Sequence, residues 1–97
     1  NNKSINVEII QNLVALHFNL NIQEMLSPRR SRSLARPRQI AMFLSKQHTT
    51  NSLPDIGRKF SNRDHTTVIH AVKKIDELMK NNNEIKQNIG EIKKKLL

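Results

Sequence analysis

The sequence has no cysteine, tryptophan or tyrosine, and only three phenylalanines among its 97 residues. Without cysteine there is no disulfide framework, which fits a reducing environment. With 36% apolar residues the core must be small and aliphatic, although a domain of this length can fold alone. The chain also lacks a long apolar run, a signal-peptide pattern and an initiator methionine. We therefore expect residues 1–97 to form one domain without a membrane-spanning segment, cut from a longer protein.

Acidic residues are scarce as well. The chain has eight Asp and Glu residues and 17 Lys and Arg residues, which gives a formal net charge of +9. Such a field favours polyanionic partners, nucleic acid first and anionic membrane second. The charge is clustered, because five of the ten residues from Arg29 to Arg38 are arginine. We interpret this cluster as an interaction site and not merely as a solvated basic surface.

Several catalytic features are missing. The chain has no glycine-rich phosphate-binding loop and no oxyanion loop, so we expect neither catalysis nor ATP binding by this segment. Asp64 and His65 resemble a fragment of a catalytic triad, but the chain is too short to build a pocket around them. His65 and His70 would point about 140° from each other around a helix. Because no cysteine or carboxylate triad accompanies them, we expect no metal site.

Apolar periodicity predicts an all-α fold of about six helices. These are expected over 7–18, 22–26, 37–46, 53–60, 64–80 and 84–96. Residues 29–36 show no such periodicity, so we predict a basic loop over 28–37, with Pro37 opening the next helix. Arg38 and Gln39 would then lie in a first helical turn, where free backbone N–H groups favour a phosphate.

The range 53–80 has the layout of a helix-turn-helix. A short helix ends near Phe60, and only residues 61–63 separate it from a longer helix. The buried stripe of the longer helix is predicted as Val68, Ala71, Val72, Ile75, Leu78 and Met79. Gly57 lowers the helix propensity of the first helix, and we expect close approach of the two helices as the compensation. The side chains that open a recognition helix reach base edges in the major groove, and here they are Asp64, His65, Thr66 and Thr67.

Each of these side chains also has a structural interpretation. Asp64 is first a candidate N-cap and second an acceptor for a cytosine amino group, and the two roles are compatible. Thr66 and Thr67 are common capping residues, but after a tight turn they also suit hydrogen bonds to bases or phosphates. Arg63 is either a solvated turn residue or a contact to phosphate or base.

Two motifs resemble those of the C-terminal DNA-binding domain (domain IV) of the DnaA family of bacterial chromosomal replication initiators. They are IGRKFSNRDHTTVIHAVKKI at 56–75 and RRSRSLARPRQ at 29–39. Where that family often has a glycine in the turn, this chain has Ser61 and Asn62. Asparagine tolerates the left-handed conformation that such a turn needs. The resemblance covers essentially the whole chain.

The resemblance implies sequence-specific binding to double-stranded DnaA boxes at a replication origin, by one monomer per box, in the cytoplasm at the nucleoid. It implies base contacts from the four side chains that open the recognition helix. It also implies a minor-groove contact from Arg30. Phosphate contacts are expected from Arg32, Arg38, Gln39, Lys46, Arg63 and Lys74. No cofactor is expected in this fragment; ATP and oligomerisation belong to an upstream domain that the fragment lacks.

Other functions stay open at this point. A transcriptional repressor or transposase segment with the same motif would need a dimer surface and a palindromic site. A basic adaptor for proteins or anionic lipid is a third class. The arginine cluster itself is either a general phosphate clamp or a source of one arginine for a narrow A·T-rich minor groove.

Overall fold

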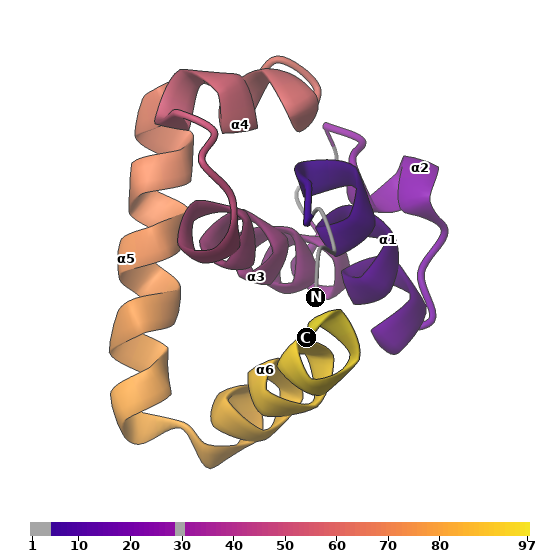
Figure 1. Cartoon of the computed structure of the whole chain (residues 1–97), viewed down its shortest axis with the longest axis vertical. Coiled ribbons are helices and arrows are strands. Elements are labelled where there is room, and N and C mark those ends of the chain that lie inside the picture. Colours follow the sequence, from indigo (N-terminus) through magenta and orange to yellow (C-terminus); the bar gives the residue numbers. More distant parts are fainter. Residues whose placement is uncertain (1–4, 29–30) are drawn as a thin grey trace.

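The computed structural model describes residues 5–28 and 31–97, which form six helices and no strand. The helices are α1 (Val7–His17), α2 (Ile22–Met25), α3 (Arg32–His48), α4 (Leu53–Lys59), α5 (His65–Asn81) and α6 (Asn83–Leu96). The all-α prediction is confirmed. In Figure 1, α3 lies in the middle, with α5 on one side, α1 and α2 on the other, α4 above and α6 below. None of the helices in these two ranges is long and apolar enough to cross a lipid bilayer.

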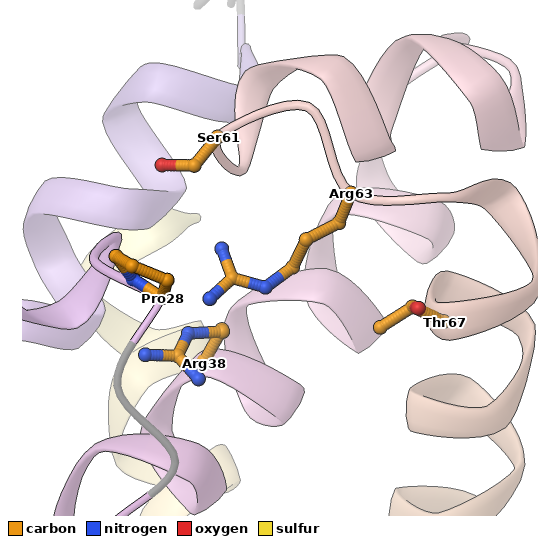
Figure 2. A pocket seen from close by; sticks show the side chains of 5 residues that line it. All are labelled: Pro28, Arg38, Ser61, Arg63 and Thr67. Carbon is orange, nitrogen blue, oxygen red and sulfur yellow. The ribbon is translucent and has the colours of Figure 1, made fainter.

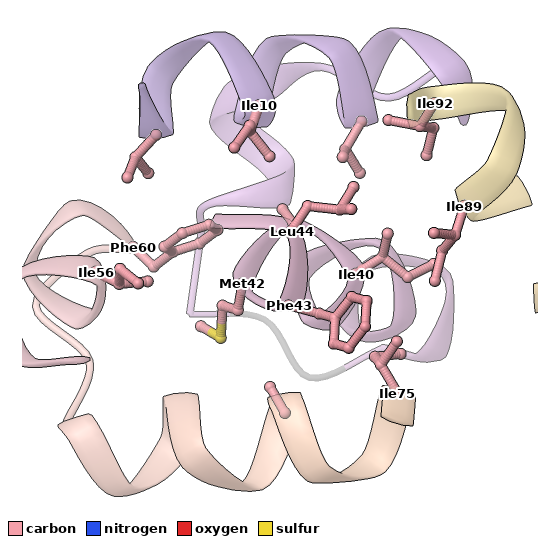
Figure 3. Packing of buried hydrophobic residues seen from close by; sticks show 14 of the residues in the cluster. Ile10, Ile40, Met42, Phe43, Leu44, Ile56, Phe60, Ile75, Ile89 and Ile92 are labelled. Atoms are coloured by element: carbon pink, nitrogen blue, oxygen red, sulfur yellow. The ribbon is translucent and has the colours of Figure 1, made fainter. Parts of the chain in front are cut away.

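The core surrounds α3. All residues from Ile40 to Ser45 are buried, so this helix has almost no solvent face along that stretch. Figure 3 shows side chains from α1, α4, α5 and α6 converging on it. Because α3 packs against α1, α2, α4 and α5, it fixes where α4 and α5 sit. The aliphatic core expected from the composition is confirmed.

The start of α3 was predicted wrongly. The helix begins at Arg32, so residues 32–36 are helical and not part of a loop, and Pro37 lies inside the helix. The Ser31 carbonyl accepts the first backbone hydrogen bonds, from the N–H groups of Leu34 and Ala35. Arginine is a good helix former, and only Leu34 in this turn is buried, so a helix forms here without a visible apolar period. Arg38 and Gln39 consequently lie beyond the first turn, and free N–H groups do not surround them.

The first helix begins at Val7 as expected, and its buried face includes one polar residue. The Asn6 side chain caps α1 by accepting a hydrogen bond of 2.8 Å from the Ile9 N–H. Two apolar residues of this helix, Ile9 and Leu16, are 41% and 68% exposed. Gln11 is buried in their place, since its amide donates to the Lys59 carbonyl at 2.9 Å and so satisfies its polar group.

The turn between α4 and α5 has left-handed backbone at two successive residues, Ser61 (φ 61°) and Asn62 (φ 56°). Past them the chain folds back, and the Arg63 N–H donates to the Gly57 carbonyl at 2.8 Å. A Cβ at Gly57 would lie 2.2 Å from the Arg63 carbonyl oxygen, so no larger residue fits without moving the backbone. A close approach compensates for Gly57 as predicted, but it is to the turn at Arg63 and the N-cap residue Asp64 and not to α5 itself.

The last helix closes the end of the molecule opposite α4. Asn82 alone separates α5 from α6, and its side chain caps α6 by accepting from the Ile85 N–H at 3.1 Å. His17 of α1 holds α6 through a contact of 2.9 Å between its Nε2 and Asn88 Oδ1. The predicted helix over 84–96 is confirmed to within one residue.

Candidate nucleic-acid interface

The first turn of α5 presents a set of polar side chains to solvent. Asp64, His65, Thr66 and Thr67 are all exposed, while Val68 is fully buried. Asp64 has extended backbone (φ −65°, ψ 149°) at the N-cap position, so the helix starts directly behind it. Burial of Val68 anchors this turn to the core and fixes the direction of the exposed side chains. The structure thus brings together the four residues predicted to contact bases.

The Asp64 carboxylate contacts the side chains of Thr66 and His65. It makes no capping hydrogen bond, so the N-cap position is confirmed but the expected capping bond is not. Thr66 Oγ1 donates to Oδ2 at 3.0 Å, and His65 Nδ1 lies 3.0 Å from Oδ1. The pKa of Asp64 is lowered chiefly by the Thr66 hydroxyl and secondarily by His65 and nearby backbone N–H groups. At neutral pH this carboxylate is an ionised acceptor, the complement of a cytosine amino group.

Arg38 points into the molecule. It is only 7% exposed, and its guanidinium donates from Nε to the Met25 carbonyl at 2.8 Å and from Nη2 to the Ser27 carbonyl at 2.9 Å. Burial, followed by the positive charge of Arg63, lowers the pKa of Arg38 to about 10. The side chain therefore remains charged at neutral pH.

Arg63 points to the same place from the other side. Its Nη1 donates to the carbonyls of Phe60 at 2.6 Å and Leu26 at 3.2 Å, and its Nη2 donates to the Ser27 carbonyl. The Ser61 hydroxyl also donates to the Leu26 carbonyl. Burial lowers the pKa of Arg63. The interpretation of Arg63 as a solvated turn residue is wrong.

Two hollows lie beside these arginines. The first, of about 390 Å³, is lined by Pro28, Arg38, Ser61, Arg63 and Thr67. Figure 2 shows the Arg63 guanidinium reaching across this hollow toward Pro28, with Arg38 below it. The second, of about 200 Å³, lies between α3 and α5 and adds Gln39 and His70 to the polar lining. No acidic side chain is among the described residues that line either hollow, so both suit a negatively charged or hydrogen-bond-accepting ligand.

Two polar residues that line these hollows, Ser61 and His70, were not predicted as binding residues. His70 was considered only as a metal ligand, and Ser61 only as a turn residue. His70 follows Thr67 by three residues, and that spacing on a helix places both on one face. This signal was present in the sequence. The contact of the Ser61 hydroxyl with a residue 35 positions earlier left no local signal.

The remaining predicted contacts are mostly exposed cations. Arg32, Lys46 and Lys74 are exposed, and none has an ion pair within the two described ranges. Gln39 is half-buried, and its side-chain oxygen accepts from Arg36 Nη1 at 2.9 Å. Exposed cations without carboxylate partners are the groups that can replace counterions on a phosphate backbone.

Arg30, the predicted minor-groove residue, lies outside the described residues. The nearest described residues are Pro28, which ends the segment after α2, and Ser31, the N-cap of α3. Over the rest of the described chain, no group of three His, Asp or Glu side chains is close enough to hold a metal ion. The described site therefore offers hydrogen-bonding groups and positive charge, both of which can bind a polyanion.

The chain matches one sequence family, described as "Bacterial dnaA protein helix-turn-helix", over residues 7–75. The match runs from the start of α1 into α5. It thus includes the first turn of α5 and every described residue that lines the two hollows.

Individual relatives carry the name "Chromosomal replication initiator protein DnaA". The one from Ehrlichia ruminantium (strain Gardel) is 53% identical over 90 residues, which cover 93% of this chain and 19% of that protein. The one from Wolbachia pipientis wMel is 51% identical over 94 residues, covering 97% and 20%. The one from Rickettsia bellii (strain OSU 85-389) is 52% identical over 90 residues, covering 93% and 19%. The chain spans about a fifth of the length of these curated relatives.

Proposed function

Because the chain belongs to the bacterial DnaA helix-turn-helix family, we propose that it binds double-stranded DNA during the initiation of chromosome replication. Its sites are DnaA boxes at the replication origin. The observation that carries this proposal is the exposed polar first turn of α5, which lies beside two basic hollows whose described lining contains no acidic residue. The role of this segment is recognition and not catalysis, and it is exercised in the cytoplasm. ATP binding and oligomerisation belong to other parts of the full-length protein.

In this proposal α5 lies in the major groove with its N-terminal turn toward the base edges. The Asp64 carboxylate accepts from a cytosine amino group, and His65, Thr66 and Thr67 provide further hydrogen bonds and methyl contacts. The buried Val68 supports this, because an anchored first turn loses little entropy when it meets a base pair.

Affinity in this proposal comes from phosphates and from the minor groove. Arg32, Lys46 and Lys74 contact phosphates, with Gln39 beside them, and each cation releases counterions from the duplex. Arg38 and Arg63 already donate hydrogen bonds to backbone carbonyls. A phosphate contact from either of them stays a prediction.

Arg30 enters the adjacent minor groove where that groove is narrow and rich in A·T pairs, since such a groove concentrates negative potential. A single domain that contacts the major groove through α5 and the adjacent minor groove through Arg30 would recognise a short, asymmetric site. The proposed complex is accordingly one monomer per box.

A binding selection from random duplexes tests this function. We expect the selected sites to share one short asymmetric sequence, bound by a species that sediments as a monomer with and without DNA. Selection of a palindrome together with a dimer in sedimentation would favour a repressor or transposase segment. Equal affinity for cognate and scrambled duplex, with tighter binding to anionic than to neutral vesicles, would favour a basic adaptor.

A further inference from the structure

We propose that Arg63 is a positioning residue, which fixes residues 25–28, here named the loop stem, against the start of the recognition helix. This role rests on the proposed DNA-binding function, and it differs from the phosphate contact expected for Arg63. It concerns how two reading elements are held in register: α5 in the major groove and Arg30 in the minor groove.

The position of Arg63 in the chain suits such a role. Its backbone is fixed by the hydrogen bond to the Gly57 carbonyl, and the next residue is the N-cap of α5. Its guanidinium reaches back to the loop stem and donates to the carbonyls of Leu26 and Ser27. One side chain therefore joins the backbone just before the recognition helix to carbonyls 36 and 37 positions earlier.

The loop stem is held from two further directions. The Ser61 hydroxyl donates to the Leu26 carbonyl, and Arg38 of α3 donates to the carbonyls of Met25 and Ser27. These carbonyls lie at the end of α2, where a helix leaves its last carbonyl groups without internal partners. Positive groups are favoured at that end of a helix.

The arrangement brings two guanidinium groups to one carbonyl oxygen, that of Ser27. Like charges repel, and the lowered pKa of Arg38 reflects that repulsion after the effect of burial. One arginine would be enough to satisfy this carbonyl. The second, Arg63, adds the mechanical link between the loop stem and α5.

The consequence concerns the chain that follows the stem. Pro28 ends the stem, and α3 resumes at Arg32 with Ser31 as its N-cap, so both ends of the short connection are fixed. If Arg30 reads the minor groove, the Arg63 hydrogen bonds hold the described residues that precede it, the loop stem, against the start of α5. Without the Arg63 hydrogen bonds, α5 and Arg30 would both still be present. The stem would then have to be ordered on binding, and that loss of entropy would weaken the affinity for DNA.

A lysine separates the positioning role from a phosphate contact. Lysine keeps the charge, and as a point charge it serves a phosphate well, but it cannot place donors on three carbonyls as the planar fork does. Arg63→Lys should therefore weaken binding to a DnaA box almost as much as Arg63→Met, by about tenfold. In neither variant should the slope of log affinity against log salt change. Arg58→Lys is the matched control, since Arg58 is exposed on α4 and pairs only with Asp55, and it should bind as the wild type does.

A double-mutant cycle with Arg30→Ala provides the deciding measurement, with the melting temperature of each variant measured alongside. In the wild-type background Arg30→Ala should weaken box binding by about tenfold or more. In the Arg63→Lys background the same change should weaken it by less than about threefold, because residues 25–28 are no longer held against the start of α5.

The outcomes divide cleanly. Equal losses of affinity from Arg30→Ala in both backgrounds would overturn the positioning role. So would wild-type affinity in Arg63→Lys together with a flattened salt slope in Arg63→Met, which would indicate that Arg63 contacts a phosphate. No loss from Arg30→Ala in the wild type would overturn the minor-groove contact itself, and the positioning role with it.

If the Arg63 variants fail to fold, Ser61→Gly decides in their place. It removes another hydrogen bond to the stem at a residue whose φ of 61° suits glycine. Coupling between Ser61→Gly and Arg30→Ala would support the proposal, and additivity would overturn it.

Discussion

Two sets of basic side chains in this small domain face opposite ways. Arg38 and Arg63 point inward and use their guanidinium groups on backbone carbonyls. Arg32, Lys46 and Lys74 point outward and have no ion pair among the described residues. All five were expected to contact phosphate, and the charge count alone does not separate them. Their difference shows that some basic side chains stabilise the fold of the interface, while others stay available for a ligand.

The residue types explain part of the difference. Both inward residues are arginines, whose delocalised, weakly hydrated fork can be buried and can satisfy several carbonyls at once. A lysine in either place would be a strongly hydrated point charge, and it would leave carbonyls unpaired. The outward set contains both types, as expected where only charge matters.

The largest expected effect is on the turn that aims Arg63 inward. Gly57→Ala would place a Cβ 2.2 Å from the Arg63 carbonyl oxygen. Relieving this clash requires the backbone to move, so we expect a loss of about 2–3 kcal/mol in the free energy of unfolding. Gly90→Ala is the control, because a Cβ there meets nothing within 4 Å. That change should stabilise α6 by about 0.5–1 kcal/mol. Urea denaturation of both variants measures the contrast, and equal losses would contradict the close approach.

The inward and outward sets should also separate in stability. Arg38→Met leaves the carbonyls of Met25 and Ser27 without these donors, and we expect the free energy of unfolding to fall by about 2 kcal/mol. Lys46→Met, which is the same kind of change at an exposed site, should stay within about 0.5 kcal/mol of the wild type. Thermal denaturation without DNA tests this, and a stable Arg38→Met would mean that the inward set is not structural.

The smallest expected effect is a dependence of stability on pH at the other end of α3. Burial, followed by the nearby Lys93, lowers the pKa of His48 below its usual 6.5, and His48 Nε2 has no hydrogen-bond partner within the described chain. The unfolded chain therefore binds a proton more readily than the folded one. The stability this histidine provides is full above its unfolded pKa and is lost as the pH falls through and below that value.

Melting temperatures at about pH 7.5 and about pH 5.5 measure this effect. The decrease seen in the wild type should shrink in His48→Gln and persist in His70→Gln, since His70 is exposed. An unchanged decrease in His48→Gln would assign the effect to another group.

What could be predicted from the sequence was local. The α5 stripe and the close approach at Gly57 follow from spacings of a few residues. Three of the six stripe residues are buried and the other three pack half-buried against the core, and Gly57 lies against the turn. The start of α3 could not be found this way, because burial of Leu34 against the core stabilises a turn that has no apolar period of its own.

The inward arginines could not be predicted either. Arg63 meets carbonyls 36 and 37 residues away, and Arg38 meets carbonyls 11 and 13 residues away. Those partners are backbone atoms, so no residue type at either position signals the contact. By contrast, the exposed first turn of α5 could be predicted, since a turn followed by polar residues and an apolar stripe is visible in a single segment.

The central claim is that the first turn of α5 supplies specificity while the outward cations supply affinity. A salt series on a DnaA box and on a scrambled duplex of equal composition tests it most directly, with the wild type, Thr67→Ala and Lys74→Ala. We expect Thr67→Ala to reduce the discrimination between the two duplexes by about 1–3 kcal/mol without changing the salt slope. Lys74→Ala should flatten the slope by about one unit on both duplexes and leave the discrimination unchanged. The reverse pattern, with discrimination lost at Lys74 and kept at Thr67, would contradict the account.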